Sequence, residues 1–442
     1  MSTIVALSTP SGRGAIAVIR LSGPQALAIT RNLSNDFHNV KPRHATLTKI
    51  HLPGSEQTLD EVLITFFQGP ESVTGEDVIE ISCHGSPVIV RQILDAAISL
   101  GARLAGPGEF TVRALTNRKI NLVQAEAIRD LIAAQTDAAV KQAARQVGGE
   151  LSHALASVEE NLIKIIVLLE SALEFVEDDL PTAELGSVQS TLASVQKEIA
   201  DLADSYSAGR LLQSGIKVAI VGSPNVGKSS IFNRLVSRDR AIVTDVPGTT
   251  RDTLSETIDL DGVPVQLTDT AGLRETTDTI ESLGIERTQQ AMIDADLVLE
   301  VVDATNPKND RVSWNDDTRS VRILNKIDLD VADCFSSDSD SVRVSALTGE
   351  GLESLRAAIG GFLNRGDVDN EGLLVTNARH YDLLASARRE LDDAIRALND
   401  HLSEELVLVS LHNALKFLGE ITGETTTEDI LSEIFSTFCI GK

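Results

Sequence analysis

The run from Gly222 to Ser229 combines glycine, lysine and serine in an order that suits phosphate chemistry. It matches the pattern G-x-x-x-x-G-K-S/T and directly follows the apolar run 217–221. Glycines let the backbone curl so that its N–H groups point inward at phosphate oxygens. We expect Lys228 to neutralise the β- and γ-phosphates and the Ser229 hydroxyl to ligate Mg²⁺. The sequence therefore predicts a loop that binds a nucleoside triphosphate, placed between a strand and a helix.

Three further motifs follow in order, each after an apolar run that is typical of a strand. Asp269-Thr270-Ala271-Gly272 offers a carboxylate for Mg²⁺ and an N–H group for the γ-phosphate. Asn325-Lys326-Ile327-Asp328 resembles a guanine-reading motif, in which the Asp328 carboxylate accepts from the base and Lys326 packs over it. Ser345-Ala346-Leu347 resembles the loop that contacts the guanine carbonyl. Four motifs in this order favour a GTP-hydrolysing domain over four chance matches.

The predicted GTP contacts lie in these motifs and in the polar segment 244–252. They are Asn225, Val226, Gly227, Lys228, Ser229, Ser230, Thr244, Asp245, Val246, Pro247, Gly248, Thr249, Thr250, Asp269, Thr270, Ala271, Gly272, Asn325, Lys326, Asp328, Ser345, Ala346 and Leu347. Thr250 is expected to close over Mg²⁺ when the γ-phosphate is present. The predicted Mg²⁺ ligands are therefore Ser229, Thr250 and Asp269, and the plain alternative for 244–252 is a solvated loop.

One residue expected of a Ras-like enzyme is missing. Such enzymes orient the attacking water with a glutamine directly after the Asp-x-x-Gly motif, but here Leu273 follows Gly272. An apolar side chain cannot hold water, so another group must do so, and the segment 274–281 offers carboxylates. Arg251 and Arg274 are candidates for a catalytic arginine.

These motifs need a scaffold, and the chain shows three successive patterns of apolar residues. Residues 3–119 alternate short strand-like and helical runs, which predicts an α+β domain. From 121 to about 212 apolar residues recur at helical spacing, and from 217 to about 363 strands and helices alternate as in a parallel α/β sheet. Helical periodicity returns from about 378 to 438. We interpret the α/β domain as inserted into one helical domain built from both flanks, the alternative being two separate helical domains.

Composition limits the possible functions. The net charge is −26, and residues 1–119 carry +1, so the remaining 323 residues carry −27. This balance argues against non-specific nucleic-acid binding by most of the chain. The three scattered cysteines form neither a disulfide framework nor a metal cluster. The sequence shows no membrane span and no signal peptide, so we expect a cytoplasmic protein.

Longer stretches give the sequence a family resemblance. They are GRGAIAVIRLSG from Gly12, VTGEDVIEISCHG from Val73, PGEFTVRALTNRKINLVQAEAI from Pro107, PGTTRD from Pro247, DTAGLRE from Asp269 and the terminal ITGETTTEDILSEIFSTFCIGK. The chain resembles the MnmE (TrmE) family over essentially its whole length. The resemblance implies a multidomain α+β chain. Its parts would be a folate-binding and dimerising α/β domain (1–119), a discontinuous all-helical domain (120–212 and 366–442) and an inserted Ras-like P-loop GTPase domain (213–365).

The resemblance also implies site residues that spacing does not give. Arg20, Glu80, Lys119 and the terminal Lys442 match contacts to 5-formyltetrahydrofolate. Asn225 matches a potassium ligand, with further K⁺ ligands around Thr244, Val246 and Thr249. Glu281 matches the water-orienting glutamate, which would fill the gap left by Leu273. Cys439 matches a cysteine required for modification. The implied catalytic residues are thus Glu281, Lys228, Thr250 and Cys439.

The function implied is a homodimeric, potassium-stimulated GTPase of tRNA modification. With an MnmG (GidA)-like flavoprotein in a heterotetramer, it would help install a 5-(carboxymethyl)aminomethyl group on wobble uridine, using GTP, Mg²⁺, K⁺ and a folate. Two departures are the short stretch 303–321 and Leu347, where many GTPases have lysine. One rival is a ribosome-assembly or stress GTPase, and another is a folate enzyme in which the GTPase is only regulatory.

Overall fold

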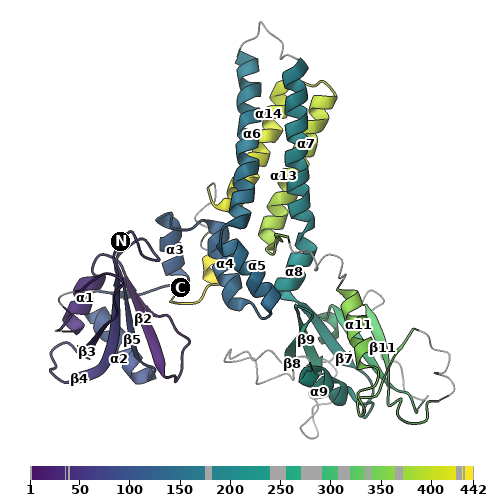
Figure 1. Ribbon diagram of the computed structural model, residues 1–442, viewed down its shortest axis with the longest axis horizontal. Helices are drawn as coiled ribbons and strands as arrows, with labels where there is room; N and C mark the ends of the chain where they lie inside the picture. The colour runs from purple at the N-terminus through teal and green to yellow at the C-terminus, as the bar shows by residue number, and fades with distance from the viewer. Residues whose placement is uncertain are drawn as a thin grey trace. The chain divides into compact units, whose positions relative to one another are not determined.

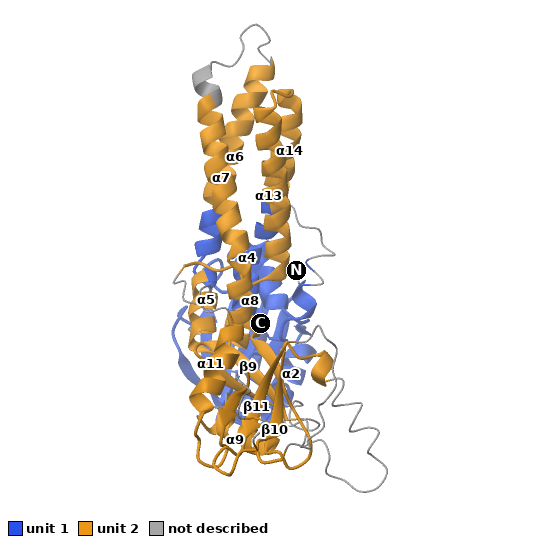
Figure 2. Cartoon of the chain, turned by 90° about the vertical axis from the view of Figure 1, so that its right-hand side faces the viewer, with its two compact units in different colours: residues 1–129, 146–155, 418–442 blue, residues 130–145, 156–417 orange. Residues whose placement is uncertain are grey.

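The structure is a computed structural model of the 442-residue chain. It describes residues 2–34, 36–37, 40–174, 182–238, 255–269, 291–306, 319–332, 335, 340–363, 372–424, 431 and 434–441. The chain divides into two compact units (Figure 2). Unit 1 contains residues 1–129, 146–155 and 418–442, and unit 2 contains residues 130–145 and 156–417.

Unit 1 contains a six-stranded sheet with the strand order β3-β4-β5-β2-β1-β6. Its elements are β1 (Ile4–Leu7), β2 (Ile16–Ser22), α1 (Ala26–Leu33), β3 (Thr46–His51), β4 (Thr58–Phe67), β5 (Val78–His84), α2 (Pro87–Ser99), β6 (Arg103–Leu104) and α3 (Glu109–Thr116). Alternate side chains of the strands are buried, as the period of two requires. They form one core with α1 and α2. The opposite face of the sheet carries Arg20 and Glu80.

The end of the chain packs within unit 1. Phe435 and Phe438 form a small core with Leu122 and Ala125. Gly108 lies directly against these two phenylalanines, because a Cβ there would lie 2.9 Å from the Phe438 Cβ. The tail therefore needs glycine at position 108, just before α3 begins.

Long helices connect and complete the two units. They are α4 (Leu122–Ala133), α5 (Asp137–Val147), α6 (Glu150–Glu174), α7 (Thr182–Asp204), α8 (Tyr206–Ser214), α13 (Ala378–Asn399) and α14 (Glu404–Thr422). In Figure 1, α6, α7, α13 and α14 run side by side as a bundle. Gln196 on α7 donates to Asp392 on α13, and His412 on α14 lies 3.2 Å from Glu170 on α6. Helices from both sides of the α/β domain thus share one bundle, which confirms the predicted insertion.

Unit 2 also contains a six-stranded sheet, with the order β12-β11-β10-β7-β9-β8. Its elements are β7 (Ile216–Val221), α9 (Lys228–Arg238), β8 (Ser255–Leu260), β9 (Val263–Asp269), β10 (Leu297–Asp303), β11 (Ser320–Asn325), β12 (Val342–Val344) and α11 (Leu352–Phe362). All neighbouring strands are parallel except β8, which pairs antiparallel with β9. The carboxyl ends of parallel strands meet at one edge, where ligands of such sheets bind.

The structure confirms the predicted fold class: a multidomain α+β chain with an inserted parallel α/β domain. Gly148 and Gly149 separate two helices, α5 and α6. No helix among the described residues is long and apolar enough to cross a membrane. The domain boundaries at 119, 212 and 365 stay predictions.

Candidate functional site: a nucleotide-binding edge

The loop between β7 and α9 has the backbone of a phosphate cradle. Gly222, Asn225 and Gly227 have φ angles of 149°, 63° and 98°, a region that favours glycine and asparagine. α9 begins at Lys228, so its first N–H groups lack partners within the helix and its dipole favours an anion there. The Lys228 Nζ donates to the carbonyls of Gly222 and Ser223 at 2.7 and 2.8 Å. These donors fit a nucleotide phosphate group.

Asn325 connects the phosphate loop to the predicted guanine loop. Its Nδ2 donates to the Val226 carbonyl at 2.8 Å, and its Oδ1 accepts from the Ala346 N–H at 3.0 Å. The residue is 2% exposed, so both bonds are shielded from water. A Cβ at Gly227 would lie 2.2 Å from the Asn325 Nδ2. Glycine at 227 is therefore required by this contact as well as by its φ angle.

The guanine-reading motif is held from two sides. Lys326 donates to Asp303, at the end of β10, over 2.5 Å. Burial raises the pKa of Asp303, but hydrogen bonds from Lys326 and Thr305 outweigh it, so the pKa lies below the ordinary 3.8. Asp328 accepts from the Ser345 hydroxyl over 2.5 Å. The structure thus brings the guanine-reading motif and the 345–347 loop together and fixes the Asp328 carboxylate beside that loop.

The predicted Mg²⁺ ligands that the structure describes lie at suitable places. Asp269 ends β9 and is 1% exposed, while Ser229 lies exposed in the first turn of α9. β9 is the direct neighbour of β7, and Asp269 is the register partner of Ile220. One hydroxyl and one carboxylate suit Mg²⁺, which keeps several waters and shares phosphate oxygens.

Several predicted residues lie outside the described part of the chain. They are Thr244, Asp245, Val246, Pro247, Gly248, Thr249, Thr250, Thr270, Ala271, Gly272, Glu281 and Lys442. The proposed switch threonine, the water-orienting glutamate and the three K⁺ ligands besides Asn225 therefore stay predictions. Asn225 itself is exposed in the phosphate loop.

In unit 1, two of the predicted folate contacts form an ion pair. Arg20 on β2 and Glu80 on β5 are register partners, and the Arg20 Nη2 lies 2.7 Å from the Glu80 Oε1. The Arg20 guanidinium also lies 5.7 Å from the centre of the Phe110 ring, at the start of α3. Lys119 is exposed, and no contact among the described residues joins it to Arg20 or Glu80.

Cys439 lies at the same end of α3. Its carbonyl accepts from the Gly108 N–H at 3.2 Å, and the next residue, Ile440, forms a bridge with Pro107. The Cys439 side chain is exposed. By contrast, Cys83 is buried, and burial together with the charge of Asp60 raises the pKa of its thiol to about 11. Of these two cysteines, only Cys439 is available for chemistry.

Sequence reasoning missed the polar groups that hold α3. Glu109 accepts from Arg103 at 2.5 Å, from Arg113 at 3.0 Å and from the Gly106 N–H at 3.0 Å. Burial raises the pKa of Glu109, but these hydrogen bonds outweigh it and bring it to about 2. Arg113 in turn reaches Glu76 at 2.7 Å. The only signal was the spacing of four between Glu109 and Arg113, which suits a helix pair.

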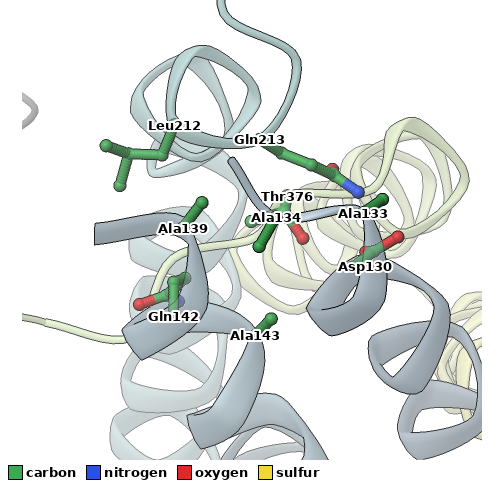
Figure 3. Close-up of a pocket in the computed structure, with 9 residues that line it drawn as sticks. All are labelled: Asp130, Ala133, Ala134, Ala139, Gln142, Ala143, Leu212, Gln213 and Thr376. Carbon is green, nitrogen blue, oxygen red and sulfur yellow. The ribbon is translucent and has the colours of Figure 1, made fainter. Parts of the chain in front are cut away.

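Unit 2 contains a small cavity between residues of α4, α5 and α8. It measures about 20 Å³, room for one water, and Figure 3 shows its alanine-rich wall. Its lining residues are Asp130, Ala133, Ala134, Ala139, Gln142, Ala143, Leu212, Gln213 and Thr376. None of them is a predicted site residue, so the cavity is a packing gap near α5 and α8.

The phosphate loop, the buried Asp269 and the linked guanine motifs define the class of this protein: it is a P-loop GTPase. Two family models match the chain, the GTP-binding protein TrmE N-terminus over residues 3–119 and the MnmE helical domain over residues 122–439. The chain belongs to the MnmE (TrmE) family.

Relatives support this assignment along the whole chain. A Koribacter versatilis protein named tRNA modification GTPase MnmE is 43% identical over 449 positions, covering 100% of this chain and 99% of the relative. A Thermotoga maritima protein of the same name is 40% identical over 456 positions and covers 100% of both. The G domain of the T. maritima FeoB iron transporter matches 33% of this chain and 98% of its own at 25% identity. The TM-score of this match is 0.24, which is too low to support the assignment.

Proposed function

We propose that this GTPase serves tRNA modification, as the names of its relatives say of them. With a flavin-dependent partner resembling MnmG, it takes part in placing a 5-(carboxymethyl)aminomethyl group on the wobble uridine of certain tRNAs. A folate supplies the one-carbon unit, and the chain works as a homodimer within a heterotetramer in the cytoplasm. The observation that carries the proposal is the 43% identity over the full length, which includes both the N-terminal part and the C-terminal tail.

The roles of the GTPase residues are proposed from the described positions of Lys228, Ser229, Asp269 and Asp328, and from the family resemblance for Thr250 and Glu281. Lys228 leaves its two loop carbonyls to hold the β- and γ-phosphates, and the loop N–H groups surround them. Ser229 and Asp269 would hold Mg²⁺, which would offset phosphate charge when bound. Asp328, steadied by Ser345, accepts from the guanine edge. Thr250 would close over the metal, and Glu281 would orient the attacking water.

A bound potassium ion belongs to the proposal, with Asn225, Thr244, Val246 and Thr249 as its ligands. Among these, only Asn225 lies in the described part of the chain, where it is exposed and has a left-handed backbone conformation. A monovalent cation there adds positive charge where negative charge grows during hydrolysis.

Unit 1 would bind the folate. Arg20 and Glu80 hold each other on the open face of the sheet and offer a cation and an acceptor to a pterin with a glutamate tail. Lys119 and Lys442 add cations for the glutamate carboxylates. The Cys439 carbonyl accepts a hydrogen bond from the N–H of Gly108, which lies two residues before Phe110 at the start of α3. The tail is thereby held at the folate face.

Reconstitution tests the proposal. The purified chain is mixed with an MnmG-like flavoprotein, unmodified tRNA, GTP, a reduced folate and glycine, which supplies the nitrogen and the carboxymethyl carbons, and the nucleosides are analysed by mass spectrometry. We expect the modified uridine only with all components, and its loss with Lys228→Ala or without folate. GTP hydrolysis with no new nucleoside and no folate binding would support a ribosome-assembly switch instead. One-carbon turnover without tRNA and partner would support the regulatory-GTPase alternative.

A further inference from the structure

One arginine outside the motifs contacts the guanine loop. The Arg234 Nε donates to the Ala346 carbonyl at 2.9 Å, and its Nη2 donates to the Leu347 carbonyl at 2.5 Å. Arg234 lies on α9, whose first residue is Lys228. A guanidinium presents its donors in a rigid fork, so it fixes two neighbouring carbonyls at once. Such charge-assisted bonds are about twice as strong as neutral ones.

These contacts set the direction of a backbone donor. In a trans peptide the C=O and the following N–H point in opposite directions. Since Arg234 draws the Ala346 carbonyl toward α9, the Leu347 N–H points away from α9. No residue in the described part of the chain accepts from this N–H. The neighbouring donors are already used, because Ala346 donates to Asn325 and Thr348 donates to the Ser345 hydroxyl.

The same helix therefore reaches both ends of a bound nucleotide. Lys228 and Ser229 at its start would face the phosphates under the proposed function, and Arg234 holds the loop that would face the base. A second arginine one turn further, Arg238, pairs with Glu353 at the start of α11 and does not touch the guanine loop. Arg238 is also exposed, which makes it a matched control for Arg234.

We propose that Arg234 is a specificity-determining positioning residue: it orients the 346–347 peptide so that the Leu347 N–H donates to the O6 carbonyl of guanine. This inference rests on the guanine recognition proposed above. The arginine makes no contact with the base. Its effect is preorganisation, because the loop spends no binding free energy on ordering when the nucleotide arrives. At position 347, where many GTPases have lysine, this chain has an exposed leucine.

Two base analogues test the O6 contact, because the effect of each substitution is compared between nucleotides that keep O6 and one that lacks both O6 and the N1–H. Dissociation constants of the full chain are measured by calorimetry for GDP, for inosine diphosphate, which keeps O6, and for 2-aminopurine riboside diphosphate, which lacks it. Arg234→Ala should weaken GDP and inosine diphosphate about tenfold, the size of one oriented hydrogen bond of about 1.4 kcal/mol. It should leave 2-aminopurine riboside diphosphate within about twofold. Arg234→Lys should recover part of the loss, since a single ammonium can hold one carbonyl.

The outcomes separate the inference from the proposed function. If Arg234→Ala weakens the binding of all three nucleotides equally, the site has loosened in general and the inference is overturned. The inference is also overturned if Arg238→Ala causes the same O6-dependent loss of affinity as Arg234→Ala. No loss in Arg234→Ala, with wild type still preferring GDP over ADP, overturns the inference and leaves guanine recognition standing. A wild-type chain that binds ADP as tightly as GDP contradicts the proposed guanine recognition itself. Circular dichroism at each step confirms that the variants are folded.

Discussion

Replacing Glu109 by glutamine should weaken the N-terminal part of the chain in a pH-dependent way. The carboxylate holds Arg103, Arg113 and the Gly106 N–H at the start of α3, and these bonds bring its pKa from 4.5 to about 2. A depressed pKa means that the carboxylate stabilises the folded state fully above pH 4.5. This contribution is lost as the pH falls toward 2, where the folded form also binds the proton.

The magnitude follows from the shift. One pKa unit corresponds to about 1.36 kcal/mol, so the upper bound is about 3 kcal/mol. The Glu109 side chain is 18% exposed and its partner Arg103 is 51% exposed, so screening by solvent reduces the expected loss to about 2 kcal/mol. Glutamine keeps an acceptor for Gly106 but places an amide group beside two guanidinium groups. The free energy of opening α3 should be lower in the variant than in the wild type at pH 7. This difference in free energy should fall by more than half at pH 3.

Hydrogen exchange measures this locally. Peptides that cover residues 105–118 are followed by mass spectrometry at pH 7 and pH 3, with intrinsic exchange rates corrected at each pH. Glu160→Gln is the control, because Glu160 makes a fully exposed pair with Lys164 on α6 and should change nothing measurable. A loss of protection in Glu109→Gln that is the same at both pH values would refute the electrostatic reasoning and leave only a packing effect.

Further outcomes follow from particular contacts. Gly209→Ala on α8 should lower the melting temperature by several degrees, because its Cβ would meet the Val375 carbonyl at 2.1 Å. Gly361→Ala on α11 meets nothing within 4 Å and should be neutral or stabilising by up to about 1 kcal/mol, as calorimetry would record. At pH 8, a thiol reagent should label Cys439 and not Cys83 in the folded chain, because the raised pKa of Cys83 keeps that thiol protonated. Peptide mapping would locate the label, and labelling of both cysteines would contradict the burial of Cys83. Asn325→Asp should lower GDP affinity at least about tenfold, because it loses the donor to Val226 and buries a charge; unchanged affinity in a fluorescent-nucleotide titration would rule out the bridging role.

The local parts of the nucleotide site could be predicted from sequence, because their determinants are local. The strand at 216–221, the glycine-rich turn and the helix from Lys228 follow from hydrophobic runs and from glycine at left-handed positions. The order of the motifs then placed them at one edge of a parallel sheet. The structure confirms this arrangement for the described motifs.

Contacts between distant residues could not be predicted in the same way. Arg234 and Ala346 are 112 residues apart, and an exposed arginine on a helix is usually solvated. The tail gives a second example, since the Ser8 hydroxyl donates to the Gly441 carbonyl across 433 residues. Gly441 has a φ of 99°, and a Cβ there would lie 2.1 Å from the Leu7 carbonyl. The hydrophobic periodicity around Gly441 does not predict its contact with Leu7 and Ser8. The pairing of Arg20 with Glu80 likewise depends on strand register, so the family resemblance pointed to both residues where spacing did not.

GTP hydrolysis in potassium and in sodium buffer at equal ionic strength tests the central claim most directly. Asn225→Gly is the matched variant, since glycine tolerates the φ of 63° while removing the proposed potassium ligand. The account predicts strong stimulation by potassium in the wild type and none in the variant, with GDP affinity retained in both. Equal rates of the wild type in the two salts would contradict the cation-assisted mechanism and favour a GTPase switch of the ribosome-assembly kind.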